Sequence, residues 1–279
     1  MKFLDIDKLI YSSTKQLTNS LSCIKMYNMN CLDRSIEDLV AKFQAENKDI
    51  ITVFGGDGAL VSKWRELEGP KGKHKMLFPV RNYGMCPEHE NIYKKFLAGT
   101  EDAVQSLKMS LMQLIEARYP SKDVQSSVKA LAEVTLISAD PTQAIRFNVK
   151  INGHLAAENV IANGVIIATK FGSTGYFKSV ARTIFMDGLG VGYIAPTYSV
   201  PNIVTRMDSR IEVELIRRAP IVLTADKLKK DLGEVENGFK LEVCSACENV
   251  PVLGYEHFMC PACRRGRNST VINDNYFVV

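Results

Sequence analysis

The sequence predicts an α/β protein with an N-terminal Rossmann-like parallel sheet domain and a C-terminal, mostly-β domain that carries a zinc ribbon. Strand and helix patterns alternate at the start of the chain, strand patterns dominate after Pro120, and two Cys-x-x-Cys pairs lie near the end. We place the domains at residues 1–119 and 120–279, with the ribbon at 240–268. A chain of 279 residues, 46% of them hydrophobic, is long enough to form two cores.

The first part of the chain has the pattern of alternating strands and helices. Residues 7–13 and 23–29 have strand character, and residues 33–46 have the pattern of an amphipathic helix capped by an aspartate. An apolar run, Ile50 to Phe54, predicts a buried strand, and a helix is expected to begin near Ala59. Ligands of parallel sheets bind at the carboxyl ends of the strands, so the residues after Phe54 are candidates for function.

Three glycines and one carboxylate follow that strand directly, in the order Gly55, Gly56, Asp57 and Gly58. Glycine lets backbone N–H groups approach a phosphate closely, and the start of the next helix adds its positive end. A carboxylate repels a phosphate, so Asp57 is expected to accept a proton from a substrate hydroxyl or to act through a metal ion. The alternative is a tight strand-to-helix turn in which Asp57 only caps the helix.

The elements that follow are mostly strands. Residues 101–119 are expected to form one long helix, because Leu107, Leu111, Leu114 and Ile115 form an apolar stripe. After this helix, apolar or alternating patterns predict strands at 128–138, 144–151, 160–169, 210–216, 221–224 and 270–279.

A second glycine-rich segment follows the apolar run Gly164 to Thr169. Residues 170–176 read Lys-Phe-Gly-Ser-Thr-Gly-Tyr, and a short helix is expected after them. The chain therefore contains two strand-to-loop elements that carry hydrogen-bond donors. Together, Gly-Gly-Asp-Gly and Gly-Ser-Thr-Gly-Tyr resemble the NAD kinase family, which transfers the terminal phosphate of ATP to the adenosine 2′-hydroxyl of NAD.

The resemblance extends over roughly residues 50–223. Leu77 to Gly84 is similar to the family's second strand and its Asn-x-Gly turn, and Ala130 to Leu136 is similar to its Leu-Asn-Glu-Val strand. The resemblance implies phosphorylation of the 2′-hydroxyl of NAD or a related adenine nucleotide, with ATP and Mg²⁺ as the donor system. It also implies a homo-oligomer.

The resemblance further implies roles for individual residues. Asp57 is the implied catalytic base, oriented at the ribose hydroxyl, and Tyr176 is suited to stack on the adenine. The interdomain cleft is the expected active site, because the two loops come from different domains. The residues implied to bind or shape the nucleotide site are Gly55, Gly56, Gly58, Asn82, Glu133, Asn163, Thr174, Gly175, Tyr176 and Ser179.

The sequence departs from the family pattern at several positions. Ala132 replaces the asparagine of the Asn-Glu pair, and Asn163 stands where the family usually has an aspartate. Lys170 and Phe171 replace a Pro-Thr pair, so the second loop is bulkier and more basic. Either the substrate differs or catalysis has been lost, because an unpaired polar group in a site discriminates strongly against the old ligand.

Two alternatives to an NAD kinase remain open. The first is a non-catalytic nucleotide-binding sensor or assembly module, in which the altered second loop binds a nucleotide and the zinc ribbon docks a partner. The second is a lipid or sugar kinase, because diacylglycerol kinases and phosphofructokinases also use a Gly-Gly-Asp loop. The Gly-Ser-Thr-Gly-Tyr segment argues against the second.

Four cysteines near the end of the chain have the spacing of a zinc ribbon. The two Cys-x-x-Cys pairs are separated by twelve residues, and each is expected to form a knuckle whose thiolates converge on one tetrahedral ion. Four thiolates leave no open coordination position, so the zinc is expected to be structural. A basic turn at residues 264–267 could contact a protein or nucleic-acid partner. The expected ligands are Cys244, Cys247, Cys260 and Cys263.

Composition favours a cytoplasmic protein without a membrane partner. The net charge of +4 is too small to indicate nucleic-acid binding over the whole surface. The longest apolar runs fall short of the ~20 residues that a bilayer helix needs, and acidic residues occur where a signal peptide would be apolar. Cys23, Cys31 and Cys86 show no paired spacing, which suits reduced thiols in a cytosol.

Overall fold

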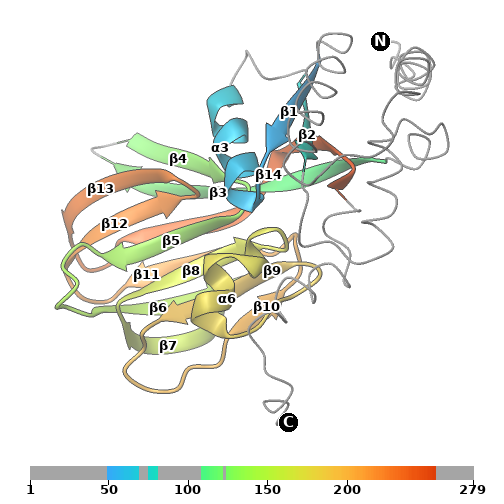
Figure 1. Ribbon diagram of the computed structural model, residues 1–279. Helices are drawn as coiled ribbons and strands as arrows, with labels where there is room; N and C mark the ends of the chain where they lie inside the picture. Colours follow the sequence, from blue (N-terminus) through green and yellow to red (C-terminus); the bar gives the residue numbers. More distant parts are fainter. Residues whose placement is uncertain (1–48, 69–74, 81–107, 122–123, 256–279) are drawn as a thin grey trace, which may run out of the picture. The chain divides into compact units, whose positions relative to one another are not determined.

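The fold is that of a computed structural model, which describes residues 49–68, 75–80, 108–121 and 124–255 (Figure 1). The described chain forms two compact units, one containing residues up to 111 and from 250 on, the other containing residues 112–249. The domain limits expected from the sequence differ from these units in the placement of residues 112–119 and 250–255. The strands expected at 7–13, 23–29 and 270–279 and the helix expected at 33–46 lie outside the described residues.

The first unit contains parallel strands with a helix beside them. β1 (Ile50–Phe54) pairs in parallel with β2 (Met76–Val80), and Leu77 of β2 pairs in parallel with Val252 of β14 (Lys240–Leu253). α3 (Asp57–Leu67) buries Leu60, Val61 and Trp64 and lies beside β1 and β2 (Figure 1). The predicted buried strand, the helix after it and the parallel sheet are confirmed.

The second unit is built almost entirely from antiparallel strands, as the sequence predicts. In one sheet β14, β11, β6 and β7 follow one another, and β3 pairs with β14 and β4; in the other the order is β10-β9-β8-β5-β12-β13. Their bounds are β3 Met109–Ser121, β4 Val124–Ala130, β5 Glu133–Ser138, β6 Ile145–Ile151, β7 His154–Ala162, β8 Gly164–Thr169, β9 Leu189–Ile194, β10 Ile203–Thr205, β11 Ile211–Leu215, β12 Ala219–Ala225 and β13 Leu228–Val235.

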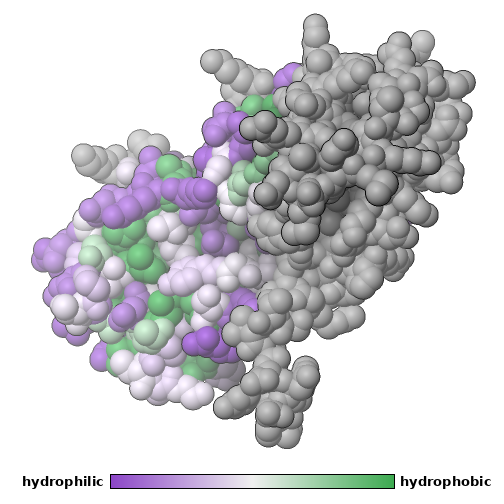
Figure 2. Space-filling view, in the orientation of Figure 1, coloured by the Kyte–Doolittle hydropathy of each residue, from purple (hydrophilic) through white to green (hydrophobic). Residues whose placement is uncertain are grey.

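The two sheets of the second unit share one core. Phe147 and Val213 of the first sheet and Ile167 and Leu223 of the second are all buried in the same apolar cluster. This packing follows from strand alternation, because successive side chains point to opposite faces and one face of each sheet is apolar. On the face of this unit that Figure 2 shows, hydrophilic residues surround smaller apolar patches.

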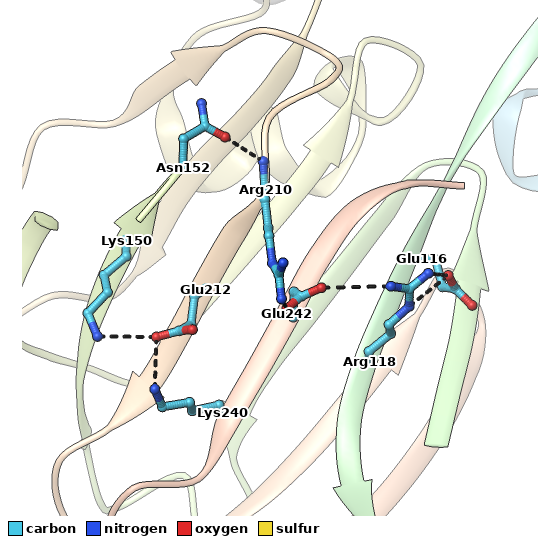
Figure 3. Close-up of polar contacts among 8 residues, drawn as sticks. All are labelled: Glu116, Arg118, Lys150, Asn152, Arg210, Glu212, Lys240 and Glu242. Carbon is cyan, nitrogen blue, oxygen red and sulfur yellow. Dashed lines mark hydrogen bonds and ion pairs between the residues drawn. The ribbon is translucent and has the colours of Figure 1, made fainter. Parts of the chain in front are cut away.

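The outward face of the first sheet carries alternating charges. In β11 the buried residues Ile211, Val213 and Leu215 alternate with the partly exposed Glu212 and Glu214. Pairs with this exposure contribute little stability each, but they leave the face polar and its charges balanced. The ion pairs drawn in Figure 3 join Lys150 and Lys240 to Glu212, Arg118 and Arg210 to Glu242, and Arg118 to Glu116.

The long helix expected at 101–119 is wrong from Met109 onward, because this stretch is β3. Residues 101–107 lie outside the described part of the chain. The stretch is rich in good helix formers, yet it pairs with β4 from Ile115↔Ala130 to Ser121↔Val124, and this pairing overrides local propensity.

Two other predicted strands are each divided into two. The stretch 128–138 is broken at Leu131 and Ala132 into β4 and β5, and the stretch 160–169 passes at Asn163 from β7 in one sheet to β8 in the other. The strands predicted at 144–151, 210–216 and 221–224 are confirmed as β6, β11 and β12. None of the helices in the described ranges has the length and apolar character that a bilayer crossing requires.

Candidate functional site

The first glycine-rich turn joins β1 to α3 in the first unit. Gly55 has a φ of +120°, a conformation that side chains rarely adopt, and Gly56 is the N-cap residue of α3. Ala59 and Leu60 donate backbone hydrogen bonds to the Gly56 carbonyl at 3.0 and 3.3 Å. Asp57 is therefore the first helical residue and not the cap, which places its carboxylate at the positive end of an 11-residue helix.

The second glycine-rich turn, in the second unit, joins β8 to α6 (Tyr176–Ala181) through a short 3₁₀ turn at Gly172–Thr174. A Cβ atom on Gly172 would lie 2.2 Å from the Ala132 carbonyl oxygen and 2.8 Å from Oε2 of Glu133. Only glycine fits here, because the loop packs directly against the backbone at the start of β5.

The structure brings Glu133 together with this loop, as the resemblance implies. A Cβ atom on Gly175 would lie 3.9 Å from the same Glu133 oxygen, so the carboxylate stands beside both glycines. Tyr176 follows with 45% of its surface exposed, and Ser179 is also exposed on α6. A carboxylate, a glycine turn and an open aromatic ring therefore lie next to one another in sequence or space.

Thr174 takes part in the turn itself. Its hydroxyl donates to the Phe171 carbonyl at 3.4 Å. The neighbouring Ser173 is fully buried, and its hydroxyl lies 2.9 Å from the Lys170 carbonyl and 3.0 Å from the Phe185 carbonyl. The hydroxyls of the Gly-Ser-Thr-Gly segment thus fix the shape of the loop.

Helix α6 is held on the sheet by an aromatic pair. Phe177 is fully buried and meets Phe185 edge to face, with ring centroids 5.2 Å apart. A Cβ atom on Gly190 of β9 would lie 2.4 Å from the Phe185 ring and 2.7 Å from the Phe177 ring. The absence of a side chain at Gly190 therefore makes room for the pair that anchors the loop's helix.

Sequence reasoning missed Asp226, which holds the turn before Glu133. Its carboxylate accepts backbone hydrogen bonds from Leu131 at 2.8 Å, Ala132 at 2.7 Å and Glu133 at 3.1 Å. Asp226 itself has a φ of 52° in the two-residue hairpin between β12 and β13. A short Asp-Lys hairpin is visible in the sequence, but its contact with a turn so distant along the chain is not.

Thr169, at the end of β8, supports the same turn. Its hydroxyl lies 2.7 Å from the Leu131 carbonyl and 3.2 Å from the Ala132 carbonyl, and it accepts the N–H of Gly172 at 3.3 Å. Ala132, where the family has asparagine, is buried, and both its N–H and its carbonyl are held. The substitution therefore removes a side-chain amide from a backbone that remains firmly positioned.

The remaining expected site residues lie elsewhere or outside the described ranges. Asn163 precedes β8 while the glycine loop follows it, so the six residues of the strand separate the two by about 20 Å. Asn82 lies outside the described residues. Lys170 and Phe171 replace the family's Pro-Thr pair. Lys170 is exposed, whereas the Phe171 ring is buried and therefore adds no bulk to the surface of the loop.

Of the four expected zinc ligands, the structure describes two, and these two do not lie in a turn. Cys244 and Cys247 lie within β14, Cys244 partly and Cys247 largely exposed, so the expected knuckle is a strand here. Burial raises the pKa of the Cys244 thiol. Cys260 and Cys263 lie outside the described residues. Within the ranges that the structure describes, no group of three or more His, Cys, Asp or Glu side chains could hold a metal ion.

Several proteins that are similar in sequence to this chain are named NAD kinase. The NAD kinase of Pyrococcus abyssi is 27% identical over 201 residues, which cover 68% of each chain. The NAD kinase of Streptococcus gordonii is 31% identical over 170 residues, 58% of each chain. No protein-family model matches the chain.

Solved structures agree in fold. Yeast NADH kinase complexed with NADH matches with a TM-score of 0.61 at 16% identity, covering 83% of this chain and 68% of that one. An NAD kinase from Archaeoglobus fulgidus in complex with ATP matches with a TM-score of 0.54 at 20% identity, covering 78% and 83%. The fold is thus one that kinases of pyridine dinucleotides adopt. The chain is similar in sequence and in fold to members of the NAD kinase family.

Proposed function

We propose that this protein is an ATP-dependent kinase that phosphorylates the 2′-hydroxyl of NAD or a related adenine nucleotide. The observation that carries the proposal is the position of the Glu133 carboxylate, whose Oε2 stands beside the backbone of Gly172 and Gly175. An acidic side chain beside a glycine turn suits a ribose, because its carboxylate accepts hydrogen bonds from hydroxyls. Tyr176, with its exposed ring next to that turn, suits the stacking of an adenine.

Asp57 is the residue proposed to carry the proton transfer. In the reaction the substrate oxygen forms a bond to the γ-phosphorus of ATP while the bond from that phosphorus to ADP breaks. The hydroxyl proton passes to the Asp57 carboxylate, and ADP leaves. Asp57 begins α3, so the positive end of the helix lies beside its carboxylate, which supports the binding of a phosphate there.

Magnesium is proposed to arrive with the nucleotide. Mg²⁺ in kinases is held mainly by substrate phosphates with one or two carboxylates, and it neutralises charge on the transferring group. Such binding needs no preformed cluster of protein ligands, which agrees with the lack of one among the described side chains.

An activity assay with Asp57→Asn tests the proposal. The wild-type protein is expected to form NADP from ATP, Mg²⁺ and NAD, and the variant is expected to lose about 10²- to 10⁴-fold in kcat. Glu66→Gln is the matched control, because it removes a carboxylate from the exposed side of the same helix, where 61% of the side chain is accessible. No transfer from any phosphate donor, or full activity of Asp57→Asn, would refute the catalytic assignment.

The alternative of a non-catalytic nucleotide-binding module is favoured by one observation, the apolar Ala132 beside Glu133. Calorimetry with NAD and ATP separates the two. Tight nucleotide binding without turnover would support the sensor, whereas binding accompanied by product formation would support the kinase.

The zinc site remains a separate proposal, supported by the spacing of Cys244, Cys247, Cys260 and Cys263. We expect native mass spectrometry of protein purified without chelator to show one zinc per chain. Cys260→Ser is expected to lose the metal because one of four thiolate ligands is removed, whereas Cys86→Ser, at an unpaired cysteine, is expected to keep it. Metal-free wild-type protein, or full zinc content in Cys260→Ser, would contradict the site. Its proposed partner, a protein or a nucleic acid, and the proposed homo-oligomer need separate measurements.

A further inference from the structure

A small polar cavity lies in the second unit at the end of the strands opposite to the glycine loop. Its volume is about 220 Å³, and it is lined by Ser138, Gln143, Arg146, Arg217 and Arg218, among others. Ser138 ends β5, whereas Glu133 begins it, so the cavity is about 17 Å from the Glu133 end. It is therefore a different site from the one proposed for the nucleotide.

Two of the arginines around the cavity have no carboxylate partner within the part of the chain that the structure describes. Arg218 is paired with Glu234 and with Glu236, the latter at 3.5 Å. Arg146 and Arg217, in contrast, make no ion pair with the described residues. Two guanidinium groups beside one cavity repel each other unless an anion lies between them.

The nearby carboxylate, Asp140, is engaged in its own turn. Its oxygens accept hydrogen bonds from the Thr142 N–H at 2.9 Å, the Thr142 hydroxyl at 2.6 Å and the Gln143 amide at 2.8 Å. The hydrogen bonds from Thr142 hold the pKa of Asp140 below its usual value. These contacts turn the carboxylate toward its own loop, and the positive charge of Arg146 and Arg217 remains for a ligand.

From this arrangement we infer that the cavity is a binding site for a phosphoryl group of a small molecule. The planar guanidinium presents paired donors that match the oxygens of a phosphate, and such charge-assisted bonds are the strong ones. A cavity of about 220 Å³ is smaller than the ~300–1,000 Å³ of typical ligand pockets, so it suits a compact phosphate compound and not a dinucleotide. The inference does not depend on the proposed kinase activity.

Calorimetric titration of the full chain with inorganic pyrophosphate tests the site. We expect saturable binding, and the double variant Arg146→Gln/Arg217→Gln is expected to weaken it at least about tenfold, because two charge-assisted contacts are lost. Arg206→Gln is the matched control, because Arg206 is 84% exposed and paired with Asp208 away from the cavity. Arg146→Lys keeps the charge but loses the fork, so an intermediate affinity is expected.

The outcomes separate this site from the nucleotide site. Pyrophosphate held only by the kinase site would bind the double variant as tightly as the wild type, and that result overturns the inference. The absence of any saturable binding to the wild type also overturns it. Unfolding curves without ligand show whether each variant is folded. The single variants Arg146→Gln and Arg217→Gln, provided that they fold, must each weaken pyrophosphate binding; if either binds as tightly as the wild type, the inference is wrong.

Discussion

The two glycine-rich turns, one after β1 and one after β8, have similar sequences but need glycine for different reasons. Gly55 adopts a φ of +120°, and the nearest atom that a Cβ there would meet is the Ala59 side chain at 3.1 Å. Gly172 needs no unusual φ, but the Ala132 carbonyl leaves no room for a Cβ. The first requirement is local to its own turn, whereas the second is imposed by the turn between β4 and β5, some forty residues earlier in the chain.

The difference also appears in the helices that follow. α3 has 11 residues and begins at Asp57, so the carboxylate lies at the positive end of one continuous helix. α6 has six residues and ends where Arg182 adopts a left-handed conformation, and it depends on the buried Phe177 for its position. We therefore expect the conformation of the first turn to be insensitive to substitutions elsewhere in the chain. The conformation of the second turn is expected to be lost when its packing partners are substituted.

The largest effect is expected for Gly172→Ala. The added Cβ would lie 2.2 Å from the backbone oxygen of Ala132, in the turn between β4 and β5, so the loop must move, at a cost of about 2–3 kcal/mol in the free energy of unfolding. The movement displaces the turn from Glu133, so nucleotide affinity is expected to fall as well. Urea unfolding and calorimetry measure the two effects. A variant with wild-type stability and wild-type nucleotide affinity would contradict the prediction, because it would show that the turn accommodates a Cβ at position 172.

A smaller effect is expected for Asp226→Asn. The amide keeps one oxygen, which can still accept from Ala132 and Glu133, but it loses the oxygen that accepts the Leu131 N–H, so a cost of about 1–2 kcal/mol in the free energy of unfolding is expected. Because Asp226 acts on the position of Glu133, the KM for NAD is expected to rise more than kcat falls. Asp231→Asn is the matched control, since this exposed carboxylate accepts only the Gly233 N–H, at 2.9 Å. Equal losses in both variants would argue against a positioning role.

The sequence could predict the first turn well and the second only in part. β1, the glycines and α3 follow from an apolar run and a break within twenty residues, and periodicity suffices there. The roles of Gly172, Thr169 and Asp226 depend on contacts between β5, β8 and the β12–β13 hairpin, which local pattern does not contain. The family resemblance assigned Glu133 and Gly175 to one nucleotide site, and in the structure the Glu133 carboxylate lies beside Gly175. No signal in the sequence indicated that Asp226 holds the turn before Glu133.

The same limit explains the helix wrongly expected before Tyr119. Leu111, Leu114 and Ile115 fit a helical stripe, but the buried residues Ile115, Ala117 and Tyr119 fit the two-residue period of a strand, and Ile115 belongs to both patterns. The choice between them is made by pairing with β4, which is a tertiary contact. Similarly, the single apolar run at 160–169 contains a change of sheet at Asn163. Asn163 lies at the end of β8 opposite to the glycine loop, away from the nucleotide site proposed here.

The smallest effects are expected in the first turn, where two alanine substitutions separate backbone strain from space. Gly55→Ala forces a side chain into a φ of +120°, with an expected cost of about 1–3 kcal/mol. Gly58→Ala, three residues later, adds a Cβ with no heavy atom within 4 Å inside α3, where alanine is favoured over glycine by up to about 1 kcal/mol. The first variant should therefore unfold at lower urea concentration than the wild type, and the second at an equal or higher one. If Gly58→Ala were destabilised as much as Gly55→Ala, the cause would lie in the turn as a whole, and the contrast between a locally determined turn and a packing-determined one would not hold.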